Sequence, residues 1–80
     1  MLSQKPCDSW CAPGMACCTD LYLGDVDNQY AYSPTNCRNI CNSRSDCFGW
    51  TWVVADSWCW LKGYPLPDPS RSDCCISGLK

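Results

Sequence analysis

Histidine and glutamate are both absent from this 80-residue chain, whose eight acidic side chains are all aspartates. Without histidine there is no imidazole to act as the base of a Ser-His-Asp triad or to bind a metal ion. The positions of the aspartates do not define a cleft with a catalytic pair of carboxylates. We therefore expect no enzymatic activity, no bound metal and no cofactor.

Long apolar runs and concentrated charge are also missing. No stretch approaches the roughly 20 apolar residues that a membrane-spanning helix needs, so we expect no membrane insertion. The six lysines and arginines are scattered and the net charge is −2, which argues against nucleic acid as a partner. No Asn-x-Ser/Thr sequence occurs, so N-glycosylation is not expected. Residues 1–6 lack the apolar core of a secretory signal, and we expect a mature domain with Met1 added on expression.

Cysteine, in contrast, is abundant, with ten in 80 residues. A chain this short buries little apolar surface, and small secreted domains compensate with disulfides. The even count predicts five disulfides and an oxidising compartment. Zinc is the alternative, but the adjacent pairs Cys17–Cys18 and Cys74–Cys75 do not match the C-x2-C spacing of zinc ligands. The residues alone leave the pairing of the cysteines open.

One short helix organises the chain. Ser33 has the side chain of a good N-cap, and Pro34 suits the first helical position. We predict a helix over residues 34–43, because the residues that follow have turn chemistry and no apolar periodicity. Cys37 and Cys41 are four residues apart and share one face of this helix.

Beyond the helix the pattern changes to the alternation typical of strands. Aromatic residues at 48, 50 and 52 predict a strand over residues 48–54, and residues 58–62 can return as the second arm of a hairpin. On the second arm alternate side chains lie on opposite faces: Cys59 and Leu61 on one, and Trp58, Trp60 and Lys62 on the other. We expect a small, disulfide-rich α+β fold in which the helix packs on an antiparallel sheet.

The remaining segments are interpreted as loops and short strands. Residues 7–18 form a cysteine-dense loop with a Pro-Gly turn signal, and residues 63–70 form an extended surface loop with three alternating prolines. Residues 20–23 are a candidate strand that ends in a turn at Gly24–Asp25. The oxygen-rich stretch 25–28 could suggest calcium, but it lacks the later Gly and the Glu of an EF-hand. We expect solvated turn carboxylates there.

The stretch from Tyr32 to Lys62 resembles the signature of the PAN/Apple family. That signature is a helix with C-x3-C, a further cysteine heading an aromatic strand, and a C-W-L-K strand. In this sequence the matching elements are Cys37 and Cys41, Cys47 with residues 49–52, and residues 59–62. Residues 20–26 resemble the opening strand of the family, and residues 75–78 its closing strand. The resemblance implies a PAN/Apple-like domain over residues 18–80, preceded by an additional N-terminal cystine-rich arm over residues 1–17.

The resemblance also implies two disulfides, Cys37–Cys59 and Cys41–Cys47. The pairing of the six other cysteines stays open: Cys7, Cys11, Cys17, Cys18, Cys74 and Cys75. We expect at least one bond from the arm to the pair at 74–75, because otherwise the arm would be cross-linked only to itself.

Tryptophan is the second abundant residue, with five in the chain. We expect Trp50 and Trp52, with Phe48, to pack on the helix, whereas Trp58 and Trp60 lie on the other face. Aromatic faces suit the apolar C–H faces of sugar rings and also contacts with proteins. The candidate ligand-binding residues are therefore Trp58, Trp60, Lys62, Tyr64 and Trp10. We expect Trp60 to be largely covered, by the arm that carries Trp10, and Trp58 to be accessible.

These observations favour a secreted, extracellular module that acts as a monomer. The family resemblance implies recognition of carbohydrate or protein ligands, in adhesion or as a lectin-like element. The alternative is a cysteine-rich secreted effector, elicitor or toxin acting on a host. Glycan binding that depends on the exposed tryptophans would favour the module, and a host response without glycan binding would favour the effector.

Overall fold

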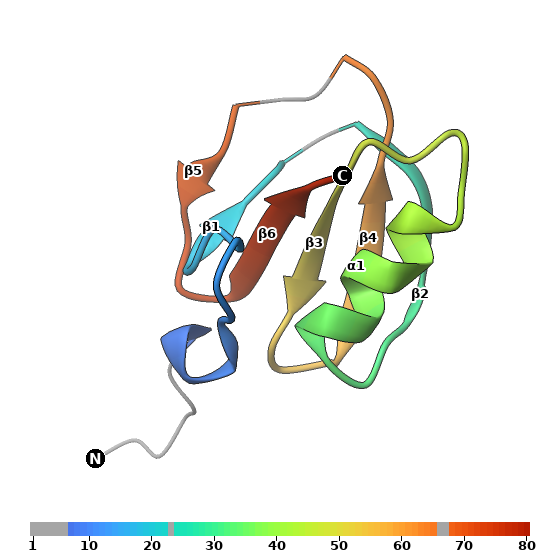
Figure 1. Cartoon of the computed structure of the whole chain (residues 1–80). Helices are drawn as coiled ribbons and strands as arrows, with labels where there is room; N and C mark the ends of the chain where they lie inside the picture. Colours follow the sequence, from blue (N-terminus) through green and yellow to red (C-terminus); the bar gives the residue numbers. More distant parts are fainter. Residues whose placement is uncertain (1–6, 23, 66–67) are drawn as a thin grey trace.

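A single helix packed on a four-stranded antiparallel sheet forms the body of the chain (Figure 1). The computed structural model describes residues 7–22, 24–65 and 68–80. In spatial order the strands of this sheet are β2 (Asp25–Tyr30), β4 (Trp58–Lys62), β3 (Gly49–Val53) and β6 (Cys75–Leu79). A second sheet pairs β1 (Thr19–Asp20) with β5 (Ser70–Arg71), and a short 3-10 helix, η1, spans Cys7–Trp10. The predicted α+β class, with one helix on an antiparallel sheet, is confirmed.

The helix α1 (Pro34–Asn42) begins and ends close to the predicted positions. The Ser33 hydroxyl accepts a hydrogen bond of 3.0 Å from the backbone N–H of Asn36, which satisfies one of the free donors of the first turn. Pro34 occupies the first turn, where it needs no hydrogen-bond partner for a backbone N–H. Cys37 and Cys41 are fully buried on the face that meets the sheet.

Five disulfides use all ten cysteines. The bonds are Cys7–Cys18, Cys11–Cys17, Cys37–Cys59, Cys41–Cys47 and Cys74–Cys75. The third and fourth are the pairs that the family resemblance implies. They close separations of 22 and 6 residues, for which chain entropy gives about 3.4 and about 2.2 kcal/mol of stabilisation. Together they hold the helix against the hairpin of β3 and β4.

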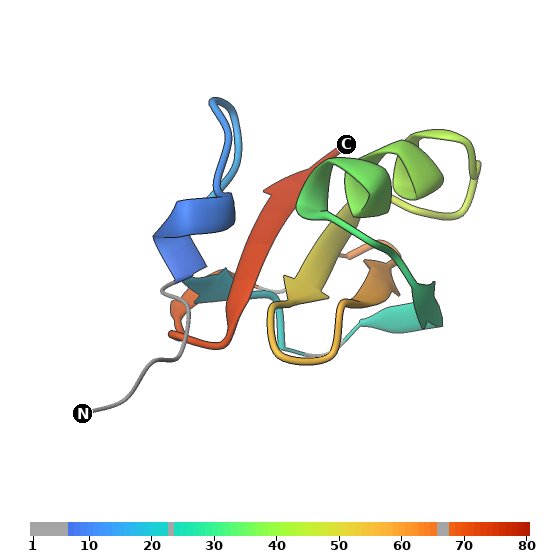
Figure 2. The same ribbon diagram turned by 90° about the horizontal axis from the view of Figure 1, so that it is seen from below.

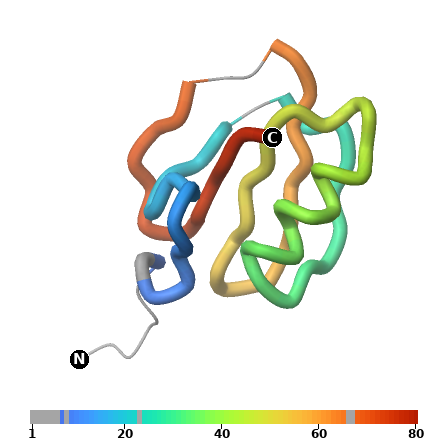
Figure 3. Tube along the Cα trace, viewed as in Figure 1, coloured from blue at the N-terminus to red at the C-terminus, as the bar shows by residue number. Residues whose placement is uncertain are grey.

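No disulfide links residues 7–18 to the pair at 74–75, so the expected bond from the arm to that pair is wrong. Both disulfides of the arm close within residues 7–18, and Cys74 is bonded to its neighbour Cys75. The connection is made by backbone hydrogen bonds instead: the N–H of Ala16 donates to Ser77 at 2.7 Å, and the N–H of Ser77 donates back at 3.0 Å. The arm therefore lies along β6, at the opposite edge of the sheet from β2 (Figure 3).

The edge strand β2 lies where the sequence predicted a turn. Residues 25–28 were expected to be solvated turn carboxylates, but Asp25–Tyr30 pairs along β4 with a register shift between Asp25 and Asp27. All six residues are exposed, so neither face of the strand carries the apolar alternation by which strands are recognised. The expected strand over 20–23 is reduced to Thr19–Asp20. The expectations for residues 1–6, and for Leu23, Leu66 and Pro67, lie outside the described residues.

Arg44, just after the helix, links that end of the helix to the edge strand. Its guanidinium pairs with Asp46 at 2.8 Å and also with Asp27 on β2. The hydrogen bonds from Arg44 hold the pKa of Asp27 and of Asp46 below the usual value of 3.8. The same hydrogen bonds, which Arg44 donates to Asp46 and to Asp27, raise the pKa of Arg44, with the bond to Asp46 as the larger cause. The pair with Asp27 is the ionic contact between β2 and the helical layer.

The core lies between the helix and one face of the sheet, which we call the helix face. Trp50 and Trp52 are buried there as predicted, with relative exposures of 0% and 1%. The indole N–H of Trp52 donates to the carbonyl of Ala31 at 2.8 Å, and Trp10 packs edge-on against the Trp52 ring at 5.4 Å. The indole of Trp50 lies directly over Gly78 of β6. The arm therefore extends this core through Trp10.

The contact between Trp50 and Gly78 predicts that any side chain at position 78 destabilises the fold. A Cβ at residue 78 would lie 2.6 Å from a ring carbon of Trp50, which has no room to move because its side chain is fully buried. We expect Gly78→Ala to lower the free energy of unfolding by about 1–3 kcal/mol, measured by urea denaturation. Gly63→Ala is the matched control, because its Cβ would meet a methyl of Val26, an exposed side chain that can turn away. Equal losses in the two variants would contradict this packing.

The ion pair between Arg44 and Asp27 predicts a pH dependence of stability. The pKa of Asp27 is lower in the folded chain, so the pair stabilises above the ordinary value of 3.8, and this contribution is lost as the pH falls through the folded pKa. We expect Asp27→Asn to lower the melting temperature slightly at pH 7, since the pair is solvent-exposed. The difference from the wild type should shrink as the pH falls below 3.8 and towards the folded pKa of Asp27. Asp56→Asn, in the exposed turn before β4, is the control; a difference for Asp27→Asn that does not change as the pH is lowered from 7 would contradict the ionic origin.

Candidate functional site

The face of the sheet opposite the helix, here called the groove face, is only partly covered. The small sheet of β1 and β5 lies on this side, away from α1 (Figure 2). Two buried hydroxyls fix it there: Thr51 accepts a hydrogen bond of 3.0 Å from the N–H of Leu21, and Ser77 donates one of 2.7 Å to the carbonyl of Thr19. The two hydroxyls are 3.0 Å apart and also hydrogen-bond to one another. Segment 19–21 thus covers β3 and β6 but not β4.

A groove of about 360 Å³ opens beside this segment. Its lining residues come from five parts of the chain: Asp20, Tyr22, Asp25, Thr51, Val53, Trp60, Lys62, Cys74 and Cys75. Thr51 and Val53 of β3 lie between Trp60 on β4 and Cys75 on β6, according to the strand register. Two strand spacings separate β4 from β6, which corresponds to about 10 Å. The groove is therefore a slot with an aromatic side chain along one side and a disulfide along the other.

The charges in the groove are nearly balanced. Lys62 is buried, with 4% of its surface exposed, and its ammonium group pairs with the carboxylate of Asp25 across the two strands. This pairing neutralises the lysine while its alkyl chain lines the groove. Asp20, which is half-buried, forms no ion pair with any residue that the structure describes. The groove therefore carries one uncompensated negative charge.

Further aromatic side chains continue the surface beyond the groove, across β4 and β2. Tyr30 is the register partner of Trp58, and Asn28 that of Trp60, so all four side chains lie on the groove face. The indole N–H of Trp58 donates to the side-chain carbonyl of Asn28 at 2.9 Å. This hydrogen bond fixes the Trp58 ring, and Tyr30 beside it is 58% exposed.

Of the predicted ligand-binding residues, the structure brings Trp60 and Lys62 into the groove and leaves Trp58 beside it. Both indoles are half-buried. Trp10 lies on the helix face against Trp52, so the arm does not cover Trp60 as expected. The reason is that the arm follows the far edge of β6, where its backbone hydrogen bonds are made.

Tyr64 lies outside the groove. Its ring packs edge-on against Phe48 at 5.7 Å, and both rings are exposed. The expectation that Phe48 packs on the helix is therefore wrong: its ring lies against Tyr64, and 42% of its surface is exposed. Tyr64 and Phe48 form a separate aromatic contact with the Lys80 ammonium 5.9 Å from the Phe48 ring.

Sequence reasoning missed Tyr22, Asp20, Asp25 and the disulfide Cys74–Cys75. Tyr22 and Asp20 enter the groove only because Thr51 and Ser77 bind segment 19–21 to the sheet. Two buried hydroxyls 26 residues apart in the sequence carry no signal that they will meet. The adjacent cysteines were a visible signal, but they were expected to bond to the arm.

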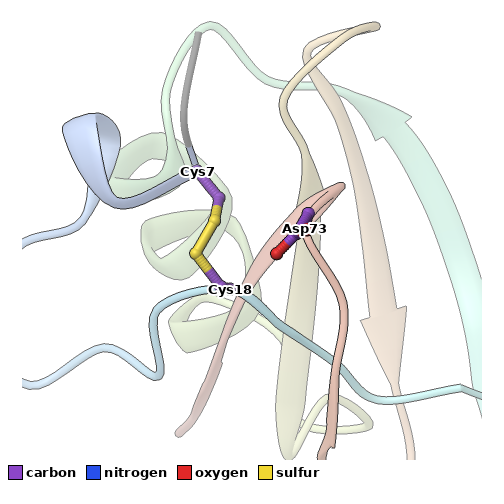
Figure 4. A group of neighbouring side chains, drawn as sticks. All are labelled: Cys7, Cys18 and Asp73. Carbon is purple, nitrogen blue, oxygen red and sulfur yellow. A yellow bond between two sulfur atoms is a disulfide. The ribbon is translucent and has the colours of Figure 1, made fainter.

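Two clusters place a carboxylate next to sulfur atoms. One joins Cys7, Cys18 and Asp73 (Figure 4), and the other joins Asp20 with Cys74 and Cys75. In each cluster both sulfurs belong to a disulfide, whereas a metal ion is bound by a thiolate. Each cluster thus offers a cation a single carboxylate in the oxidised protein.

Comparison with known protein families, with curated proteins and with solved structures finds no match for this chain. Across residues 7–22, 24–65 and 68–80, no helix has the length and apolar character required to cross a membrane. The five disulfides indicate an extracellular or otherwise oxidising environment. The function is therefore inferred from the groove itself.

Proposed function

We propose that this chain is a secreted, non-enzymatic module that binds carbohydrate through the groove. The observation that carries the proposal is the position of Trp60, which lines a slot together with Tyr22 and with the polar groups of Asp20 and Lys62. An indole ring in such a slot packs well against the apolar C–H face of a sugar ring. The resemblance of residues 32–62 to the PAN/Apple signature supports the same class of function.

The size of the groove favours a carbohydrate over a protein ligand. About 360 Å³ lies at the lower end of the range of small-molecule sites. A stable protein interface needs about 800 Å² on each partner and an apolar centre. Here the centre is a slot flanked by a carboxylate and by an ion pair, which suits a ligand with many hydroxyl groups.

The residues of the groove also support binding without catalysis. Of its two carboxylates, Asp25 is paired with the buried Lys62, which leaves Asp20 as the free acidic group. Acid–base hydrolysis of a glycosidic bond uses two carboxyl groups in different protonation states. The chain offers no histidine or glutamate to replace the second one.

The test removes the indole of Trp60, which forms the aromatic side of the groove. We expect Trp60→Ala to weaken binding of the N-acetylglucosamine hexamer or of cellohexaose by at least about tenfold, equivalent to about 1.4 kcal/mol, measured by titration calorimetry on oxidised protein. Tyr64→Ala is the matched control, since Tyr64 is an exposed aromatic residue outside the groove. Near-UV circular dichroism checks that both variants are folded.

Two results would contradict the proposal. If Trp60→Ala binds with wild-type affinity, the groove is not the binding site. A wild-type protein that binds no glycan on an array, yet elicits a response in host tissue, would favour the alternative of an effector, elicitor or toxin.

A further inference from the structure

The disulfide between the neighbours Cys74 and Cys75 has a different role from the other four. The separation between bonded cysteines is 11, 6, 22 and 6 residues in the others, and 1 residue here. The stabilisation from restricting the unfolded chain grows with the length of the closed loop, so this bond contributes the least of the five. Its presence calls for an explanation other than stability.

The backbone around the bond is held independently of it. The carbonyl of Cys74 accepts a hydrogen bond of 2.9 Å from the N–H of Val54, and the N–H of Cys75 donates to Ser72 at 3.4 Å. Cys75 also begins β6 as the register partner of Val53. The chain would therefore keep its path here without the disulfide.

The position of the bond is distinctive. Both of its residues line the groove, Cys74 exposed and Cys75 buried. The register places Trp58 directly across Val53 from Cys75, and Trp60 lies two residues further along β4 on the same face. A carboxylate oxygen of Asp20 lies within 4.8 Å of both sulfurs. One side of the slot thus consists of an apolar, polarisable sulfur pair with a hydrogen-bond acceptor beside it.

We propose that the Cys74–Cys75 disulfide is a ligand-contacting wall of the groove, which holds a neutral sugar ring between the sulfur pair and Trp60. This inference rests on the proposed function and specifies its ligand. The sulfur pair and the indole contact the two apolar faces of the ring, and Asp20 accepts a hydrogen bond from a ring hydroxyl. The uncompensated charge of Asp20 disfavours acidic sugars, because a second carboxylate would meet it in a partly buried site.

The experiment compares two double variants that each remove one partly exposed disulfide. Cys74→Ala with Cys75→Ala removes the wall, and Cys11→Ala with Cys17→Ala removes a bond in the arm, whose cysteines do not line the groove. Titration calorimetry measures the affinity for the N-acetylglucosamine hexamer, cellohexaose and hexagalacturonate, and thermal unfolding measures stability.

We expect the wall variant to lose more affinity and the arm variant to lose more thermal stability. The wall variant should lose at least fivefold in affinity for the better neutral probe, with a smaller fall in melting temperature than the arm variant. The arm variant should bind within twofold of the wild type although its loop of six residues makes its fall in melting temperature larger. The wild type should bind hexagalacturonate at least tenfold more weakly than the better neutral probe.

The outcomes separate this inference from the proposed function. If the wall variant binds with wild-type affinity but Trp60→Ala loses binding, the disulfide is not part of the binding site, and the proposed function of the groove is retained. Tighter binding of hexagalacturonate than of both neutral probes overturns the assignment of ligand class. A wild type that binds none of the three probes overturns the proposed function and the inference with it. Should the wall variant lack a native near-UV spectrum, Asp20→Ala, which removes the acceptor beside the sulfur pair, replaces it, and unchanged affinity for the neutral probe then overturns the proposal.

Discussion

The attachment of the helix to the hairpin by two buried disulfides is the constraint on which the rest of the structure depends. Cys37–Cys59 crosses from α1 to β4, and Cys41–Cys47 closes the path from the helix to β3. Once Cys59 is bonded to the helix, strand alternation puts Leu61 beside it and turns Trp60 to the other face. The same bond that stabilises the core therefore places on the groove face the residue on which the proposed binding site is built.

A chain of this size has too few residues to cover both faces of its sheet. The helix and the arm cover one face, with Trp10 packed against Trp52. On the other face, segment 19–21 is fixed over Thr51 and Ser77 by hydrogen bonds, and it ends before β4. The groove is the gap that remains between this segment, Trp60 and the turn that carries Cys74–Cys75. The groove thus forms because segment 19–21 covers only part of the sheet face opposite the helix.

Local signals in the sequence were sufficient for the helix and the hairpin. Ser33 and Pro34 determine where α1 begins, and aromatic alternation identifies β3. The edge strand β2 could not be predicted, because a strand exposed on both faces has no apolar period and owes its form to pairing with β4. In the site, strand alternation correctly placed Trp60 and Lys62 on the face away from the helix. The contribution of Asp20 and Tyr22 could not be predicted, since it depends on hydrogen bonds between residues that are 30 and 58 positions apart in the sequence.

The most direct test of the groove as the binding site uses the five indole N–H groups as reporters on both faces of the sheet. A titration of ¹⁵N-labelled, oxidised protein with the N-acetylglucosamine hexamer or cellohexaose would be followed by NMR. The account predicts that the indole signal of Trp60 shifts most, together with the backbone amides of Tyr22 and Cys75, while those of Trp50 and Trp52 stay unchanged because they lie in the helix-face core. Shifts centred on Trp10 and the helix face, with Trp60 unmoved at saturation, would contradict it.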